Sequence, residues 1–230
     1  MIIAERKPLP EVLGMLDASN EIMVLGCRSC TAICLAGGEK ESKAVCEALA
    51  LHSELKGKDW KVETVTVERA CEKEFLTPLA DFKGTVLSMA CGIGAQVMQE
   101  LCPETRVVPG VNTSNMGAPE GMGVFVEKCA GCGDCILHLT AGICPIARCA
   151  KSLLNGPCGG SQNGLCEVSK ETPCAWDQIV KALERQGRSD LLGVNIPPKD
   201  WRPSRSGGPR RIVSQEAAPG TAQREWRGEV

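Results

Sequence analysis

Apolar and polar positions alternate along the first half of the chain in a pattern that predicts strands separated by helices. Four short apolar or alternating runs are typical of strands, namely 21–26, 61–67, 84–90 and 106–111. Pro109 weakens the fourth of these predictions. Segment 37–58 has apolar residues near helical spacing and ends beside Gly57, so it predicts a helix. Strands alternating with helices indicate an α/β fold, a small parallel sheet domain with crossover helices.

The second half of the chain has a different pattern. A segment rich in Asn, Gly and Pro is predicted to be a loop, and beyond it Cys and Gly dominate, with predicted helices at 146–156 and 176–187. The last residues are polar and lack periodicity, which predicts a tail that is either disordered or laid across a partner. We therefore expect an N-terminal lead-in at 1–20, an α/β domain with an edge cysteine site at 21–123 (the loop being 112–123), a cysteine-rich, ferredoxin-like α segment at 124–194, and an extended tail at 195–230.

Composition narrows the function. The 230 residues include 26 basic and 28 acidic side chains, for a net charge of −2, which argues against a nucleic-acid binder. The start of the chain does not read as a signal peptide, and no apolar run approaches the roughly 20 residues of a spanning helix, so we expect a cytoplasmic protein without a membrane role. Thiols stay reduced there, so the 15 Cys are predicted to be metal ligands or redox groups rather than disulfides.

The strongest metal-binding pattern is Cys129-Ala-Gly-Cys132-Gly-Asp-Cys135. Two residues between successive cysteines is the spacing of bacterial ferredoxins, and it lets three thiolates converge on one iron–sulfur cluster. Gly131 and Gly133 permit the tight backbone wrap that this requires. A zinc site is the alternative, although zinc sites usually use separated pairs of cysteines. The ferredoxin pattern leaves three residues between the third cysteine and a following Cys-Pro, whereas here eight residues separate Cys135 from Cys144, so the fourth ligand stays open.

Further cysteines follow this run at irregular spacing. Together with Cys129, Cys132 and Cys135 they make eight cysteines, enough for two four-thiolate centres or for one cluster and one structural zinc. The five additional candidate ligands are Cys144, Cys149, Cys158, Cys166 and Cys174.

A second group of cysteines follows the predicted strands. Cys27, Cys30 and Cys34 come after the first strand, Cys71 after the second and Cys91 after the third. Ligand sites of open parallel sheets lie beyond the carboxyl ends of the strands, so these five could meet at one edge, where four of them would make a cluster or a zinc site. The alternative is that Cys71 and Cys91 are ordinary buried cysteines. Two other cysteines, Cys46 and Cys102, are predicted to be core residues.

Several of these runs together resemble a known family. GCRSCTAICLAGGEKE (26–41), CAGCGDC (129–135) and ICPIARCAKSLLNGPCGGSQNGLCEV (143–168) are similar to the cysteine-rich C-terminal family associated with methylenetetrahydrofolate reductase. The resemblance covers roughly residues 20–185 and points to the small V-type subunit found in acetogenic bacteria. It implies a heteromeric complex whose catalytic subunit is a flavin-carrying TIM barrel, with FMN expected only in that partner.

The resemblance also implies a role in one-carbon metabolism, in the Wood–Ljungdahl pathway. One to three [4Fe-4S] clusters would carry electrons to the partner's flavin from a ferredoxin or from a hydrogenase- or heterodisulfide-reductase-like donor. On this reading the chain has no complete catalytic site of its own. The alternative is a structural zinc subunit that stabilises the catalytic subunit or docks it to a larger complex.

Overall fold

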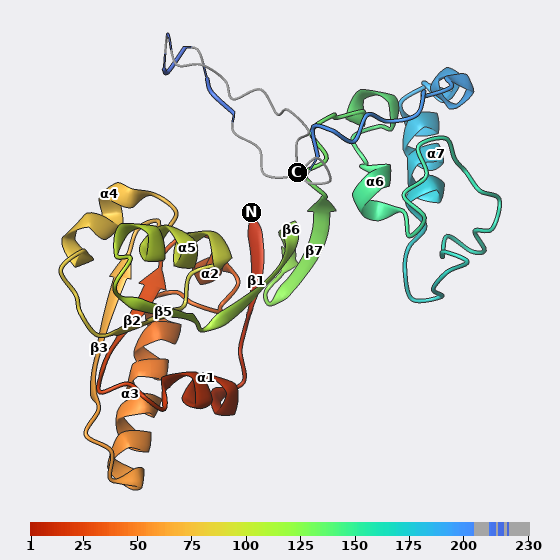
Figure 1. Cartoon of the computed structure of the whole chain (residues 1–230). Coiled ribbons are helices and arrows are strands. Elements are labelled where there is room, and N and C mark those ends of the chain that lie inside the picture. The colour runs from red at the N-terminus through yellow and green to blue at the C-terminus, as the bar shows by residue number, and fades with distance from the viewer. Residues whose placement is uncertain (205–211, 215, 219, 221–230) are drawn as a thin grey trace. The chain divides into compact units, whose positions relative to one another are not determined.

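The computed structural model describes residues 1–204, 212–214, 216–218 and 220 (Figure 1). The chain forms two compact units, Met1–Val126 and Glu127–Val230. None of the helices in these described ranges is long and apolar enough to cross a membrane.

A four-stranded parallel sheet forms the centre of the first unit. Its strands are β2 (Glu21–Cys27), β3 (Lys61–Val67), β4 (Thr85–Ser88) and β5 (Arg106–Pro109), in the order β3-β2-β4-β5. The α/β class and the four predicted strands are confirmed. Pro109 is tolerated because β5 is an edge strand and Pro109 is its last residue.

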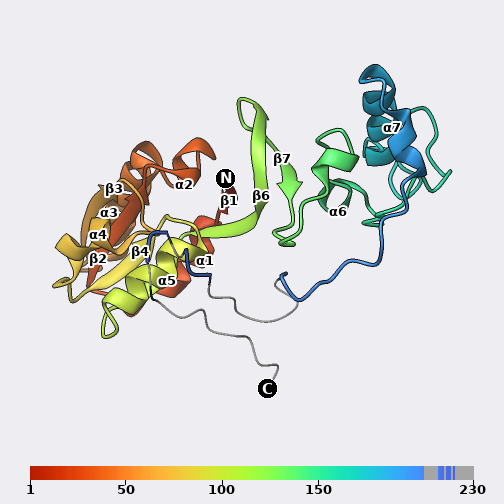
Figure 2. The ribbon, with the colours of Figure 1, turned by 90° about the horizontal axis from the view of Figure 1, so that it is seen from above.

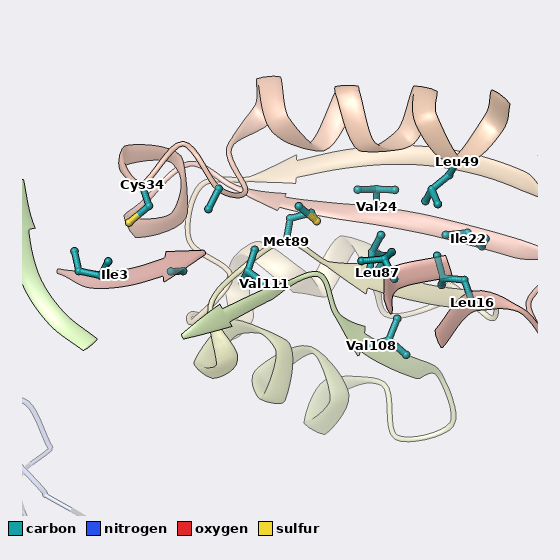
Figure 3. Close-up of a cluster of buried hydrophobic side chains, with 13 residues drawn as sticks. Ile3, Leu16, Ile22, Val24, Cys34, Leu49, Leu87, Met89, Val108 and Val111 are labelled. Atoms are coloured by element: carbon teal, nitrogen blue, oxygen red, sulfur yellow. The ribbon is translucent and has the colours of Figure 1, made fainter. Parts of the chain in front are cut away.

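Helices cover both faces of this sheet, and the alternation of side chains along β2 shows why. Ile22 and Val24 pack with α1 (Leu9–Leu16) and α3 (Glu39–Lys56) in one core, which Figure 3 shows with Leu16 and Leu49. Met23 and Leu25 pack in a second core with α4 (Lys73–Leu76) and α5 (Gly92–Leu101). A strand buried on both faces reads as a continuous apolar run, as observed.

Helix α3 confirms the prediction for 37–58, and its ends have identifiable causes. The Gly38 amide donates to Glu41 Oε2 at 3.1 Å at the start of the helix. Gly57 adopts a left-handed conformation with φ of 61° at its end. Two short elements complete the unit's helices, α2 (Cys30–Ile33) after β2 and the 3-10 turn η1 (Thr77–Leu79) after α4.

A second sheet contradicts one of the expectations and adds a strand to another predicted segment. The segment predicted as a loop at 112–123 is mostly strand β6 (Val111–Gly121), and the lead-in at 1–20 contains strand β1 (Ile2–Arg6) as well as α1. These strands pair antiparallel, and β7 (Val124–Cys129) follows β6 as a hairpin seen in Figures 1 and 2. The loop prediction was wrong because β6 is held by a partner strand far away in the sequence.

The second unit contains little regular structure. Its elements are η2 (Leu137–Leu139), α6 (Pro145–Arg148), α7 (Ala175–Arg185) and η3 (Ser189–Gly193). Helix α7 confirms the prediction for 176–187. The helix predicted at 146–156 is wrong beyond its first turn, because Cys149 is extended with ψ of 125° and Ser152 is left-handed with φ of 50°. A small core around Ile179, Leu183 and Trp176 holds these pieces together.

Residues 195–204, which we call the cover segment, belong to the predicted tail. Asn155 fixes the start of this segment, because its side chain donates to Ile196 O and accepts from Ile196 N, both at 2.8 Å. Near its end, Pro203 packs against Gly133. This part of the tail therefore lies on the second unit itself. The rest of the tail prediction falls partly on 205–211, 215, 219 and 221–230, which lie outside the described residues.

Candidate metal sites

The loop Cys129–Cys135 begins where strand β7 ends. Gly131 and Gly133 have φ of 62° and 82°, the left-handed conformation that glycine adopts without strain. The Gly131 amide donates to Cys129 Sγ at 3.3 Å. Hydrogen bonds from backbone amides to sulfur stabilise thiolates and tune the clusters they hold. The donor set and the backbone of this loop therefore fit a thiolate-bound metal centre.

The three thiols of this loop differ in exposure. Cys129 and Cys135 are exposed, whereas Cys132 is buried and lies with its Sγ 3.7 Å from Asp134 O. The loop is covered from one side, since a Cβ at Gly133 would meet Pro203 Cβ and Pro203 O at 2.8 Å. One thiol is therefore shielded from water while two remain accessible for a metal or for a further ligand.

The other candidate cysteines of the second unit lie at the ends of short elements. Cys144 precedes α6, Cys149 follows it, and the buried Cys174 precedes α7. Cys158 is exposed and is followed by Gly159, whose φ of 78° is left-handed. Cys166 is partly buried, and its amide donates to Thr172 O at 2.8 Å.

The sheet edge brings together loops that follow three different strands. Arg28 N donates to Val67 O at 2.9 Å and Ser29 Oγ donates to Glu68 O at 3.0 Å, which ties the loop after β2 to the loop after β3. A Cβ at Gly94 would lie 2.8 Å from Ala90 and 2.9 Å from Ala70. The residues directly after these two alanines, Cys91 and Cys71, are therefore carried by loops in close contact.

The electrostatics of Cys71 agree with this arrangement. The surrounding chain partly desolvates the thiol, which raises its pKa, and the neighbouring Cys27 and Cys91 thiols raise that pKa further. The strand order adds a second reason for a site here. The chain moves from β2 to β3 on one side and then to β4 on the other, so the carboxyl ends of β2 and β4 form the switch point at which open α/β sheets bind ligands.

A buried hydroxyl lies on the same face of the sheet. Ser88 is fully buried, and its Oγ has no hydrogen-bond partner in the described structure. The register pairs Ser88 with Leu25, and Leu25 and Cys27 share one face of β2. A thiolate or a bound group at this edge would supply the acceptor that the Ser88 hydroxyl lacks. The edge therefore fits a polar occupant.

The cysteines after β2 do not all face this edge. Cys34 packs in the opposite core, beside Ile3, and its thiol donates to Ile2 O at 3.5 Å (Figure 3). Burial raises its pKa, and the charge of Cys30 raises it further. Cys30 is partly exposed at the first turn of α2. The structure thus groups Cys27, Cys71 and Cys91, and sets Cys34 apart from them.

The two cysteines that the sequence assigns to the core are both found at the apolar cores of the first unit. Cys46 is partly buried against the core of α1 and α3, and Cys102 is buried with its thiol donating to Ala80 O at 3.6 Å. Among the described residues, no three or more Cys, His, Asp or Glu side chains are gathered closely enough to hold a metal ion as they stand. The candidate ligands are thus brought to two regions without being assembled into a completed site.

Sequence reasoning missed three residues that shape these regions. Lys199 lies beside Asp134 in the loop, Asn155 holds the cover segment, and Trp176 packs on Gly156. Asn155 and Gly156 fall at the end of the helix predicted at 146–156, so nothing in the sequence indicated these two contacts. Lys199 sits in a segment without periodicity, so only its charge could have drawn attention to it.

Comparison with known families gives one match. Residues 108–202 match the family described as "Methylene-tetrahydrofolate reductase C terminal", which supports a protein related to methylenetetrahydrofolate reductase. The matched segment includes Cys129–Cys135 and the five cysteines that follow, but not the cysteines of the parallel sheet. Neither the curated proteins nor the solved structures that were compared give a match.

Proposed function

We propose that this chain is a non-catalytic, electron-transfer subunit of a methylenetetrahydrofolate reductase complex. The observation that carries the proposal is the Cys129–Cys135 loop, with its left-handed glycines and its amide-to-sulfur hydrogen bond. The family match covers this loop and supports the assignment to a reductase of this kind.

In this proposal the loop residues hold a cluster and leave the chemistry of folate to a partner. Cys129, Cys132 and Cys135 supply three thiolates, and one of the later cysteines supplies the fourth. A [4Fe-4S] cluster held there supplies a one-electron carrier of low potential. The exposed Cys129 and Cys135 put this centre at the surface, where an electron donor such as a ferredoxin or a hydrogenase- or heterodisulfide-reductase-like assembly can approach.

The sheet edge is the second centre in this proposal. Cys27 and Cys91 follow the two strands of the switch point, Cys71 follows the neighbouring strand β3, and Cys30 is the nearest further thiol in the sequence. The electron acceptor is the flavin of a catalytic partner subunit, which takes up electrons one at a time and passes on two of them together as one hydride. We also propose that the complex is cytoplasmic and belongs to the Wood–Ljungdahl pathway. This part of the proposal rests on the resemblance of the cysteine runs alone.

The test is the iron, zinc and acid-labile sulfide content per chain of anaerobically purified protein. About four irons or more with matching sulfide are expected. A Cys132→Ser variant should lose iron and sulfide together, whereas Cys46→Ser, which changes a thiol of helix α3 that packs against the core, should keep both. Zinc without labile sulfide would overturn electron transfer and leave a structural subunit that stabilises or docks the catalytic one.

A further inference from the structure

A lysine of the cover segment contacts the middle of the cysteine loop. The side chain of Lys199 is only 3% exposed, although lysine is rarely buried unless it is paired. Its Nζ lies 3.3 Å from Asp134 Oδ2 and donates to Asp134 O at 3.3 Å. Asp134 lies between Cys132 and Cys135 in the sequence, so the Lys199 ammonium contacts the loop between these two cysteines.

The same carbonyl oxygen brings this charge close to a sulfur. Asp134 O is 3.7 Å from Cys132 Sγ and 3.3 Å from Lys199 Nζ. The ammonium and the sulfur are therefore no farther apart than about 7 Å, inside the screening length of about 10 Å that applies even to exposed charges. Since Cys132 and Lys199 are both shielded from water, their electrostatic interaction is screened less than a surface pair.

The cover segment holds this lysine in place through contacts at both ends. Asn155 pairs with the backbone of Ile196, and Pro203 packs on Gly133. Between them the Lys199 ammonium also lies 5.8 Å from the ring centroid of Trp201. These contacts fix the position of a cation that would otherwise be a mobile surface charge.

We infer that Lys199 and Asp134 form a charge pair that sets the electrostatic potential at the Cys129–Cys135 metal centre. This inference rests on the proposed function, since it assigns positioning residues to that centre. A thiolate-bound centre is anionic, and adding an electron makes it more so, so a nearby cation favours the reduced form and a nearby carboxylate disfavours it. The two side chains therefore act in opposite directions, and in the wild type they offset each other.

The experiment measures midpoint potentials of the iron–sulfur centres in Lys199→Met, Asp134→Asn and the double variant. Lys199→Met should lower the potential and Asp134→Asn should raise it, each by about a tenfold change in the reduction equilibrium, about 59 mV for one electron. The double variant should return close to the wild-type value. Lys181→Met, which breaks the exposed pair of Lys181 with Asp177 on α7, is the matched control and should leave the potential unchanged.

The two single variants are expected to shift the midpoint potential in opposite directions. This distinguishes an electrostatic role of the pair from a merely structural one. Two single variants that shift the potential in the same direction, or that lose metal without shifting it, would overturn the inference. If the purified chain holds zinc instead, the proposed electron transfer fails, and the inference is then tested by zinc loss to a chelator. Lys199→Met should accelerate that loss and Asp134→Asn should slow it, and equal effects would overturn the pair's role. A chain that binds neither metal overturns both proposals.

Discussion

The indole ring of Trp176 lies against Gly156, so closely that a Cβ on Gly156 would come within 2.4 Å of the ring carbon Cδ2. The same ring is fixed at its edge, because Trp176 Nε1 donates to Leu153 O at 2.9 Å. Helix α7 is thereby anchored on the NGPCGG run, and the glycine of that run makes room for the largest side chain of the second unit's core.

The first prediction concerns this contact. Gly156→Ala should destabilise the second unit by about 2 kcal/mol, because an added methyl group forces the ring or the backbone to move. The free energy of unfolding can be measured with denaturant, followed by tryptophan fluorescence. Gly193→Ala is the control, since nothing lies within 4 Å of its added Cβ, and it should change stability by less than about 0.5 kcal/mol. Equal effects of the two variants would contradict the close contact.

The second prediction concerns the attachment of the cover segment. Asn155→Ala removes both hydrogen bonds to Ile196, which should cost about 1–2 kcal/mol of local stability because each bond contributes about 1 kcal/mol. Residues 196–204 should then be cleaved faster by a protease under native conditions. Asn195→Ala, at an exposed neighbouring residue, should leave the cleavage rate unchanged. An unaltered rate in Asn155→Ala would show that other contacts hold the segment.

The third prediction separates the cysteines that follow β2. Cys91→Ala should reduce the metal content of the sheet edge, because Cys91 shares that edge with Cys27 and Cys71. Cys34→Ala should leave metal content unchanged and cost about 1 kcal/mol of stability, since its thiol packs in the opposite core. Metal analysis and denaturation of both variants make the comparison. Metal loss in Cys34→Ala would place Cys34 among the ligands.

The fourth prediction is a pH dependence that arises from Cys102. Burial raises the pKa of its thiol, so the folded chain keeps this proton to a higher pH than the unfolded chain, which loses it near pH 8.5. The stability that this difference contributes is present below about pH 8.5 and is lost as the pH rises through the raised folded pKa. Cys102→Ala should therefore lose less stability between pH 8 and pH 10 than the wild type.

A matched variant distinguishes titration from packing in that experiment. Val97→Ala removes an apolar group from the same core without removing a titrating group, so it should lower stability equally at every pH. If the slopes of stability against pH are the same for Cys102→Ala, Val97→Ala and wild type, the Cys102 thiol is not the source of the alkaline loss.

The parallel sheet could be predicted because each of its strands carries its own signal. The run EIMVLG is apolar at every position but its first, which is what burial on both faces produces, and KVETVTV is β-branched at five of its seven positions. Strand β6 could not be predicted in the same way. Residues such as Asn112, Ser114 and Asn115 have low strand propensity, and pairing with β1 outweighs that preference.

The candidate sites were predictable to different extents for a related reason. The Cys129–Cys135 spacing is local, and its glycines adopt the left-handed conformation that the spacing requires. The carboxyl edge was also predictable, because parallel strands all end at the same edge of their sheet. The sequence could not say on which side of the sheet Cys34 lies, because Cys34 follows a four-residue helix and is not part of a strand. The contact of Lys199 with Asp134 could not be predicted either, because the two residues are 65 positions apart in the sequence.

The two cysteine regions take their candidate ligands from stretches of very different length, and this affects when each region could bind metal during synthesis. The loop Cys129–Cys135 takes its three thiols from seven consecutive residues, so it can gather them as soon as that stretch leaves the ribosome. The edge takes Cys27, Cys71 and Cys91 from loops that meet only after β2, β3 and β4 have paired. Metal at the edge would therefore indicate a completed sheet, whereas a full-length chain whose first unit has misfolded would still have the thiols of the loop in place.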